Sequence, residues 1–416
     1  MSGSLGRLIM GGSLVLIGAM LTATVPVAAQ RAGSTTASSD SASDVIKTMV
    51  GQLDLERYKA TIKGLTQFGD RREGTDRNRA AADWIEAKLR SYGCTPTERL
   101  TYDFQPRPPR PPISAADAAR YRARQGTVAE GGSRVRRNHG RRGVNVDSLA
   151  QPDPTLRALD TPPSVPGERQ EVYCTKVGTK HPGEMYIVSA HMDGKGWGEA
   201  ANDDGSGTAL VMELARIFSS PNVQTDRSIR FMLWNNEETG YNGSLAYVAQ
   251  RQALQGKESP VGSGKYPEPK WLGVIQHDMM MFDHGMPRSD SSVSDTQRPE
   301  ADMNIEFQSA SKFATESQRL AWVLANSNEK YATDYPATVG QHMTNTDSGP
   351  FQDLVASVSV RENERGAQTG AGWNPHWHQP TDLYSTYTDS DFRLGLNAAQ
   401  TTLGATATLA GASLVR

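Results

Sequence analysis

The sequence has few cysteines and almost no net charge. Its 416 residues include two cysteines, and the formal charge is −2 at pH 7. A charge so close to zero gives no electrostatic argument for binding nucleic acid or an anionic membrane. No internal repeat is visible, and the length is compatible with one large α/β domain that carries inserted loops. We therefore expect no nucleic-acid partner.

Long apolar runs are scarce, and the one at the N-terminus is short. It extends from residue 8 to about residue 26 behind Arg7 and is followed by Val27-Ala28-Ala29. This pattern predicts a secretory signal peptide at residues 1–29, cleaved after Ala29. An uncleaved membrane anchor is the alternative, but the run is rich in glycine and short for a span. No cysteine lies near the cleavage site, which argues against lipid attachment there.

The mature protein is accordingly expected to be exported, either periplasmic or extracellular, with no stable membrane insertion after cleavage of the signal. Residues 30–43 are rich in Ser, Thr and Ala and are expected to form a flexible lead-in. An exported chain meets an oxidising compartment, so Cys94 and Cys174 could form one disulfide. Two buried thiols are the alternative, and the spacing cannot decide, because bridging depends on the Cα separation in the fold.

Strand-like and helix-like segments alternate over residues 44–416, which we expect to be a single domain. Strands are expected at 97–104, 170–176, 185–190, 229–234, 271–276 and 354–360. Helices are expected within 44–92, on both sides of a turn at 69–74, and at 206–219, 243–254, 319–332 and 391–409. This alternation predicts an α/β fold, a doubly wound three-layer α/β/α sandwich.

Two segments interrupt this pattern. Residues 105–170 contain twelve Arg, no Lys and six acidic residues behind a Pro-rich opening. Because long apolar periodicity is absent, we expect an irregular insertion that covers one edge of the domain. A solvated loop is the simpler interpretation, and binding of an acidic partner by the Arg cluster is the alternative. Residues 284–303 are expected to form a second, polar insertion.

Histidine and acidic side chains follow three consecutive expected strands. His191-Met-Asp193 ends the first, Glu237-Glu238 follow the second, and Asp278 follows the third. Open α/β sheets bind ligands at the carboxyl ends of their strands. Imidazole and carboxylate groups without thiolates suit a catalytic zinc site better than a structural one. The sequence therefore predicts a metal site at this edge of the sheet.

The spacing also suggests roles for individual residues. Two divalent metals about 4 Å apart need several ligands and a carboxylate that bridges them. Asp203, in the segment Asn-Asp-Asp-Gly-Ser-Gly before a helix, is the candidate bridge, and His191 is the natural first ligand. Asp193 is better placed to orient an imidazole by a hydrogen bond than to bind metal itself.

The adjacent carboxylates of Glu237 and Glu238 are expected to divide two tasks. Alternation along the chain points them in different directions, so one can bind metal while the other accepts a proton from water. The remaining ligand is expected to be a late histidine, and Asn374-Pro-His376-Trp-His378 offers two candidates.

These motifs resemble those of the secreted bacterial two-zinc aminopeptidases, the leucyl aminopeptidase and aminopeptidase Y-like zinc exopeptidases, which are related to glutamate carboxypeptidase and glutaminyl cyclase. The resemblance covers roughly residues 44–104 and 170–410. The matching pieces are Gly69-Asp-Arg, His191-x-Asp193, Asn202-Asp203-Asp-Gly-Ser-Gly, Glu237-Glu238-x-Gly-x-x-Gly-Ser244, Asp278-Met, Thr346-Asp347-x-x-Pro-Phe351 and Asn374-Pro-x-x-His378-x-x-x-Asp382.

The resemblance implies a mixed, mostly parallel sheet of about eight strands between helices, and two zinc ions. It places His191 and Asp278 on one zinc and Glu238 and His378 on the other, with Asp203 between them. His378 is favoured over His376 because an aspartate, Asp382, follows it four residues later; Asp193 and Asp382 would support the ligands. The implied function is an aminopeptidase that hydrolyses N-terminal residues of peptides through a two-zinc-activated water, with Glu237 as the general base.

Trp377 and Asp347 are expected to lie near the substrate or the oxyanion. Peptidases of this family commonly have Tyr where this chain has Trp377, so the hydroxyl donor is replaced by an indole N–H. Three other functions stay open. They are a glutaminyl cyclase acting on N-terminal Gln, a carboxypeptidase or dipeptidase with Arg361 as a carboxylate partner, and a binding module without activity.

Overall fold

A computed structural model describes residues 45–106, 144–160, 166–282, 303–332, 334–341, 346–362 and 374–415. The expected signal peptide and lead-in lie outside the described residues, as do most of the first insertion and nearly all of the second. Within these ranges, no helix is long and apolar enough to cross a membrane.

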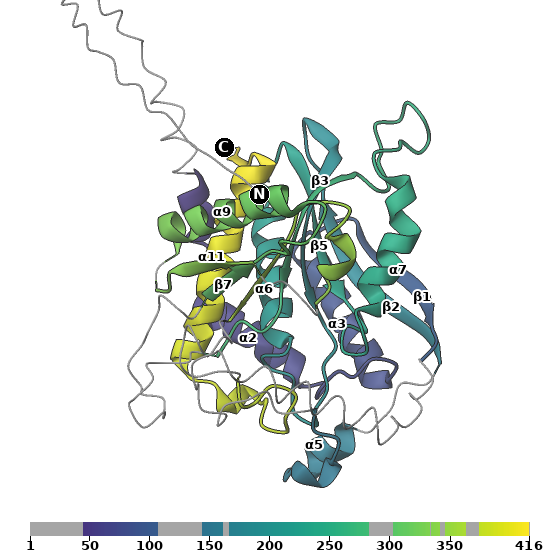
Figure 1. Cartoon of the computed structure of the whole chain (residues 1–416), viewed down its shortest axis with the longest axis vertical. Coiled ribbons are helices and arrows are strands. Elements are labelled where there is room, and N and C mark those ends of the chain that lie inside the picture. The colour runs from purple at the N-terminus through teal and green to yellow at the C-terminus, as the bar shows by residue number, and fades with distance from the viewer. Residues whose placement is uncertain are drawn as a thin grey trace, which may run out of the picture.

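Eight strands form one mixed sheet in the order β1-β2-β5-β3-β6-β9-β7-β8 (Figure 1). The neighbouring strands β5, β3, β6 and β9 run parallel, whereas β1 and β2 continue the sheet antiparallel at one edge. The strands are β1 (Thr97–Phe104), β2 (Gly167–Lys176), β3 (His181–His191), β5 (Arg227–Trp234), β6 (Lys270–His277), β7 (Met303–Glu306), β8 (Ala337–Gly340) and β9 (Ser357–Glu362), with a separate pair β4 (Val223–Gln224) and β10 (Ser413–Leu414).

Helices cover the two faces of the sheet unequally. Residues 45–50 are helical. The helices that follow are α2 (Leu55–Thr66), α3 (Asp76–Ser91), α5 (Pro154–Leu159), α6 (Gly205–Phe218), α7 (Asn242–Arg251), α9 (Ala314–Tyr331) and α11 (Asp389–Ala410), with short 3-10 turns η2 (Ser148–Ala150), η3 (Gln252–Leu254), η4 (Gly349–Phe351) and η5 (Tyr384–Thr386). Helices α2, α3, α6, α9 and α11 contribute to one core, and α7 packs over the other face beside β1 and β2.

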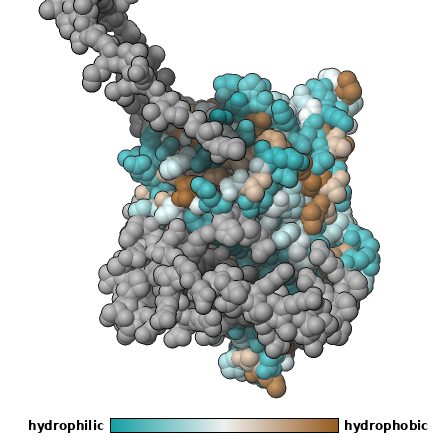
Figure 2. All heavy atoms as spheres, viewed as in Figure 1, coloured by the Kyte–Doolittle hydropathy of each residue, from teal (hydrophilic) through white to brown (hydrophobic). Residues whose placement is uncertain are grey.

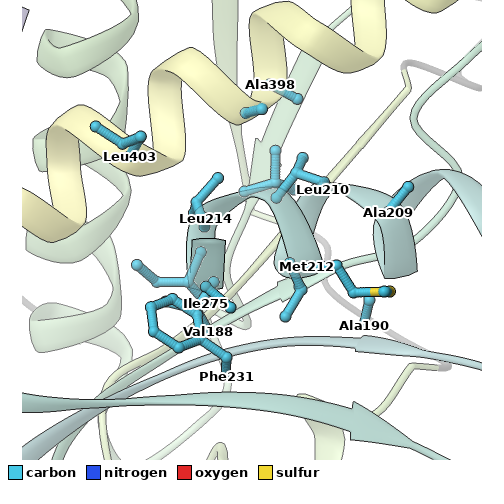
Figure 3. Packing of buried hydrophobic residues seen from close by; sticks show 14 of the residues in the cluster. Val188, Ala190, Ala209, Leu210, Met212, Leu214, Phe231, Ile275, Ala398 and Leu403 are labelled. Carbon is cyan, nitrogen blue, oxygen red and sulfur yellow. The ribbon is translucent and has the colours of Figure 1, made fainter. Parts of the chain in front are cut away.

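Helix α6 lies at the centre of the larger core. Nearly all of its residues are buried, because it is covered by the sheet on one side and by α2 and α11 on the other. Figure 3 shows Met212 and Leu214 of α6 between Phe231 of the sheet and Leu403 of α11. Full burial of such side chains contributes about 1.5–3 kcal/mol each. The residues that precede α6 are therefore attached to a rigid element.

The structure resolves the choice between a disulfide and two thiols. Cys94 and Cys174 are bonded, with their Cα atoms 5.8 Å apart. Cys94 follows α3 and Cys174 lies on β2, so the bond ties a helix end to the antiparallel edge of the sheet. A covalent link of this kind between distant parts of the chain is typical of proteins from oxidising compartments.

The expected α/β/α sandwich and eight-stranded mixed sheet are confirmed, but three local expectations were wrong. Strand β2 begins at Gly167, inside the expected insertion, because β1 pairs with it over its whole length. Residues 154–159 form α5, where an irregular segment was expected. The helix-start signals were present in the sequence: the Asp153 carboxylate accepts the Thr155 N–H, and Pro154 occupies the first helical position. Strands β7 and β8 were not expected, since four residues are too few to show a period.

Candidate metal centre

The expected site residues meet at the carboxyl ends of β3, β5 and β6. His191 is the last residue of β3, Asp278 follows β6 directly, and Glu237 and Glu238 lie in the turn between β5 and α7. Asp203 stands immediately before Asp204, the N-cap of α6. Each side chain is therefore held at the end of a buried element, where the main chain has little freedom to move.

Five of these side chains form two clusters that share one carboxylate. His191, Asp203 and Asp278 make the first cluster, and Asp203, Glu238 and His378 the second; the ligand atoms within each lie within 4.8 Å of one another. Asp203 Oδ1 lies 3.3 Å from His191 Nε2, and Asp203 Oδ2 lies 2.8 Å from His378 Nε2. Each oxygen of Asp203 thus faces a different imidazole, which is the arrangement a bridging carboxylate requires.

The donor set fits zinc. It consists of imidazole nitrogens and carboxylate oxygens, and His378 Nδ1 and Glu238 Oε1 are buried without a hydrogen-bond partner among the described residues. Burial alone would lower the pKa of His378, but the carboxylates of Glu238 and Asp203 raise it to about 9. The same carboxylates that stabilise a proton on His378 would also stabilise a bound metal cation.

His378, and not the other late histidine, enters the second cluster. Nε2 of His378 lies 3.0 Å from Oε2 of Glu238. His376 instead places Nδ1 2.9 Å from Oγ1 of Thr381. The indole of Trp377 stacks on the imidazole of His378, with the ring centroids 3.8 Å apart. Trp377 therefore lies directly against the second cluster.

Asp193 supports both the first histidine and the paired glutamates. Its main-chain oxygen lies 3.0 Å from Nδ1 of His191. Its carboxylate accepts the main-chain N–H groups of Glu237, at 3.1 Å, and Glu238, at 3.3 Å. One buried aspartate therefore fixes the turn that presents the two glutamates.

Asp382 supports the shared carboxylate. Its two oxygens accept the main-chain N–H groups of Asn202, at 2.9 Å, and Asp203, at 3.1 Å. The hydroxyl of Tyr387 also donates to it. Asp382 thus holds the main chain of Asp203, which belongs to a different loop from its own.

Asp204 is a supporting residue that sequence reasoning missed. Its carboxylate accepts the main-chain N–H groups of Gly207, at 2.8 Å, and of His191 and Met279, each at 3.2 Å. It therefore joins the start of α6 to the ends of β3 and β6. An Asp before Gly-Ser-Gly at a helix start was the available signal, and it indicated only a cap.

Glu237 is partly buried close to the clusters without belonging to either. Burial, followed by the Glu238 carboxylate, raises the pKa of Glu237 well above its usual range, against the opposing effect of His191. Asp347 lies in the same acidic surroundings: it accepts the Ser244 hydroxyl at 2.7 Å, and burial raises its pKa to about 8. The chemistry available here is that of a carboxylate with an unusually high affinity for a proton.

Two positively charged side chains, Lys195 and Arg361, lie beside the candidate ligands, and each contacts one cluster. Lys195 Nζ lies 2.9 Å from Oε2 of Glu238 and donates to the Glu238 main-chain oxygen at 2.7 Å. Arg361 donates from Nη2 to Oδ2 of Asp278 at 3.1 Å. These contacts partly balance the concentrated negative charge of the clusters.

Comparison with known sequences gives one family match and several partial relatives. The model of Peptidase family M28 matches residues 172–401. "Aminopeptidase YwaD" of Bacillus subtilis is 42% identical over 82 residues, which are 20% of this chain and 17% of that protein. "Probable zinc metalloprotease" of Pyricularia oryzae is 28% identical over 219 residues, which are 49% of this chain and 34% of that protein. The chain thus matches well under two thirds of either relative's length.

Comparison with solved structures shows the fold. An aminopeptidase from Aneurinibacillus sp. strain AM-1 superposes with a TM-score of 0.56 and 18% identity, over 89% of this chain and 97% of that chain. A glutaminyl cyclase from Bacteroides thetaiotaomicron superposes with a TM-score of 0.51 and 12% identity, over 85% of this chain and 97% of that chain.

Proposed function

This chain belongs to peptidase family M28, a family of zinc-dependent peptidases, and from that premise we propose that it is an exported aminopeptidase that uses two zinc ions to remove N-terminal residues from peptides. The observation that carries the proposal is the orientation of Asp203, whose two oxygens face the imidazoles of His191 and His378. His191 and Asp278 would hold one ion, Glu238 and His378 the other, and Asp203 both.

Zinc in such a site supplies a Lewis acid that lowers the pKa of water and polarises a substrate carbonyl. The protein's own contribution begins with Glu237. Its main-chain N–H is held by Asp193, and its surroundings raise the pKa of its carboxyl, so that the carboxylate has a high affinity for a proton. Glu237 is therefore suited to accept the proton of the attacking water and to deliver it to the leaving amine.

The acidic surroundings support selection for a free N-terminus. Asp203, Asp278 and Asp347 are buried, and Glu237 and Glu238 partly buried, in the region of the two clusters. The carboxyl oxygens of Glu237 and Asp347, which are in neither cluster, can accept hydrogen bonds from a substrate α-amino group. The cations that could meet a substrate carboxylate, Lys195 and Arg361, already pair with site carboxylates. Trp377, whose indole stacks on the imidazole of His378, is our candidate for contact with the developing oxyanion.

Export is supported by the disulfide between Cys94 and Cys174. It is consistent with the signal peptide expected at residues 1–29. The test is to express the full chain, determine the N-terminus of the product and assay its location in periplasm, medium and cytoplasm. Retention of the uncleaved chain in the cytoplasm would contradict export.

The activity is tested with the mature, zinc-loaded protein and a mixed pool of peptides, read by mass spectrometry. Stepwise loss of residues from N-termini supports the aminopeptidase and reveals its side-chain preference. Shortening from C-termini would replace it with a carboxypeptidase. Loss of ammonia from peptides with N-terminal Gln, without shortening, would replace it with a glutaminyl cyclase. The same preparation of Glu237→Gln serves as the control for contaminating peptidases.

A further inference from the structure

Residues 144–160 are the longest described stretch of the first insertion, and they contact the two loops that carry the candidate metal ligands. We call them the strap. One loop, residues 194–203, leads to Asp203, and the other, residues 374–383, contains His378. The strap contains η2 and α5, and Figure 1 shows α5 at the lower end of the molecule, below α2 and α3. Asn145 and Gln151 of the strap donate hydrogen bonds to residues of both loops.

The two loops are already interlocked before the strap is considered. The main-chain N–H of Glu199 donates to the main-chain oxygen of Asp382 at 2.8 Å. Gly196 has a φ of 109° and lies so close to His378 that a Cβ atom there would collide with the His378 main chain. The position of one loop therefore depends on the position of the other.

Gln151 of the strap joins both loops through a single side-chain amide. Its Nε2 donates to the main-chain oxygen of Trp197 at 2.6 Å and to that of Pro380 at 3.0 Å. Gln151 is 1% exposed, so neither bond has water as a ready replacement. The amide is itself oriented, because its oxygen accepts the Asp153 N–H at 3.1 Å.

A second strap residue, Asn145, contacts the candidate metal ligand His378 directly. The main-chain N–H of Asn145 donates to the main-chain oxygen of His378 at 3.0 Å, and its side-chain amide donates to the main-chain oxygen of Gly196 at 3.3 Å. His378 has a φ of 54°, in the left-handed region that costs a non-glycine residue about 1 kcal/mol or more. Surrounding contacts must hold such a residue in place, and the strap provides one of them.

The far end of the strap is anchored to the rigid part of the domain. Asp160 is fully buried, and its Oδ1 accepts the main-chain N–H of Asp70 at 2.9 Å. Arg71, which follows Asp70, donates to the main-chain oxygen of Met192, just before the first loop, at 2.9 Å and to that of Ala200, within the loop, at 2.8 Å. The attachments of the strap are thus polar and inward, while Figure 2 shows apolar side chains on the outer tip where α5 lies.

We propose that the strap is a positioning element of the metal centre and that Gln151 is its positioning residue. By holding the loops at Trp197 and Pro380, Gln151 keeps His378 facing Asp203 and Glu238. The inference rests on the proposed function, since it concerns the same zinc centre. His191 ends β3 and Asp278 follows β6 directly, and among the residues that the structure describes neither is hydrogen-bonded to a residue of the strap. Loss of Gln151 therefore weakens the site that contains His378 more than the site that contains His191.

The test measures zinc rather than activity. The mature protein, loaded with zinc, is titrated with a competing chelator. The zinc retained per chain is determined by elemental analysis. In Gln151→Glu, a carboxylate oxygen replaces the amide nitrogen and faces two main-chain oxygens. We expect one of two zinc ions to be lost at roughly 10- to 100-fold lower chelator concentration than in wild type, with a smaller shift for the other, which shares Asp203.

Two further variants make the result specific. Gln151→Asn keeps the amide but shortens the side chain by one methylene, so it should weaken the same zinc ion to a smaller extent. This variant tests the proposal if Gln151→Glu folds poorly. Gln250→Glu makes the same chemical change on exposed α7 and should titrate as wild type does. Retention of both ions by Gln151→Glu and Gln151→Asn, or equal weakening of both ions, would overturn the role of the strap. A wild-type protein that binds no zinc would instead overturn the proposed function.

Discussion

Oδ2 of Asp203 lies 2.8 Å from Nε2 of His378, and both residues are at most 5% exposed. Because the other oxygen of Asp203 faces His191, removal of this carboxylate affects both clusters at once. We expect Asp203→Ala to bind fewer than two zinc ions per chain and to lose activity. Elemental analysis after dialysis measures the first effect. Asp76→Ala, an exposed change on α3, is the control, and retention of two ions and full activity by Asp203→Ala would contradict the bridging assignment.

Glu237 is predicted to act on protons and not on zinc. Glu237→Gln keeps the size of the side chain and the N–H that Asp193 accepts, but the amide cannot accept a proton from water. We expect zinc content to match wild type and kcat to fall by roughly 10²- to 10⁴-fold. Steady-state kinetics on a peptide amide, with zinc measured on the same sample, tests this. A parallel loss of zinc would mean that Glu237 is a ligand.

The indole N–H of Trp377 can be tested separately from the stacking of its ring on His378. Trp377→Phe keeps an aromatic ring against His378 and removes the N–H. If the indole N–H stabilises the oxyanion, kcat falls by roughly 10²- to 10³-fold, as for loss of one oxyanion donor, while zinc content is unchanged. An unaltered kcat would leave Trp377 a packing partner of His378 only.

Asp160 is predicted to make the stability of the fold depend on pH. Burial, followed by the nearby Asp70 carboxylate, raises the pKa of Asp160 to about 8, against the effect of Arg77 and Arg72. A carboxyl with a raised pKa in the folded state costs stability progressively as the pH rises above its usual value and through about 8. Asp160→Asn avoids this cost and still offers an oxygen to the Asp70 N–H.

We therefore expect Asp160→Asn to unfold at a higher temperature than wild type at about pH 9, and the difference to shrink towards about pH 5. Thermal unfolding followed by circular dichroism across this range measures the effect. Asp147→Asn, at an exposed position of the strap, is the control. A constant difference between Asp160→Asn and wild type at all pH values would show that Asp160 does not titrate in this range.

The buried strands and the residues at their ends could be predicted from sequence, because each leaves a local signal. The strand that ends at His191 is a continuous apolar run, and its polar ending marks the sheet edge. Strands β7 and β8 left no such signal: each has four residues, and β7 includes Asn304 and Glu306, which bond to each other. Their place is fixed by pairing with β9 and with each other.

The supporting residues of the site were harder to predict, for a different reason. Asp204 and Gln151 act by accepting or donating hydrogen bonds with main-chain groups 13 to 229 residues away in the sequence. A main-chain partner carries no side-chain signature, so no motif reveals the contact. Gln151 was further hidden in a segment whose composition favoured a solvated loop. Such residues become visible only when the loops are placed in space.

The left-handed main chain at His378 has a consequence for how the protein acquires its metal. The contacts that hold this residue come from Asn145 and Gly196, and those that hold Asp203 come from Asp382; all are protein groups. In small zinc-dependent domains the ion supplies the folding energy. Here contacts within the protein hold both residues, so we expect a preparation from which zinc has been removed to keep its fold. Zinc would then decide whether the site can act, and not whether the chain folds.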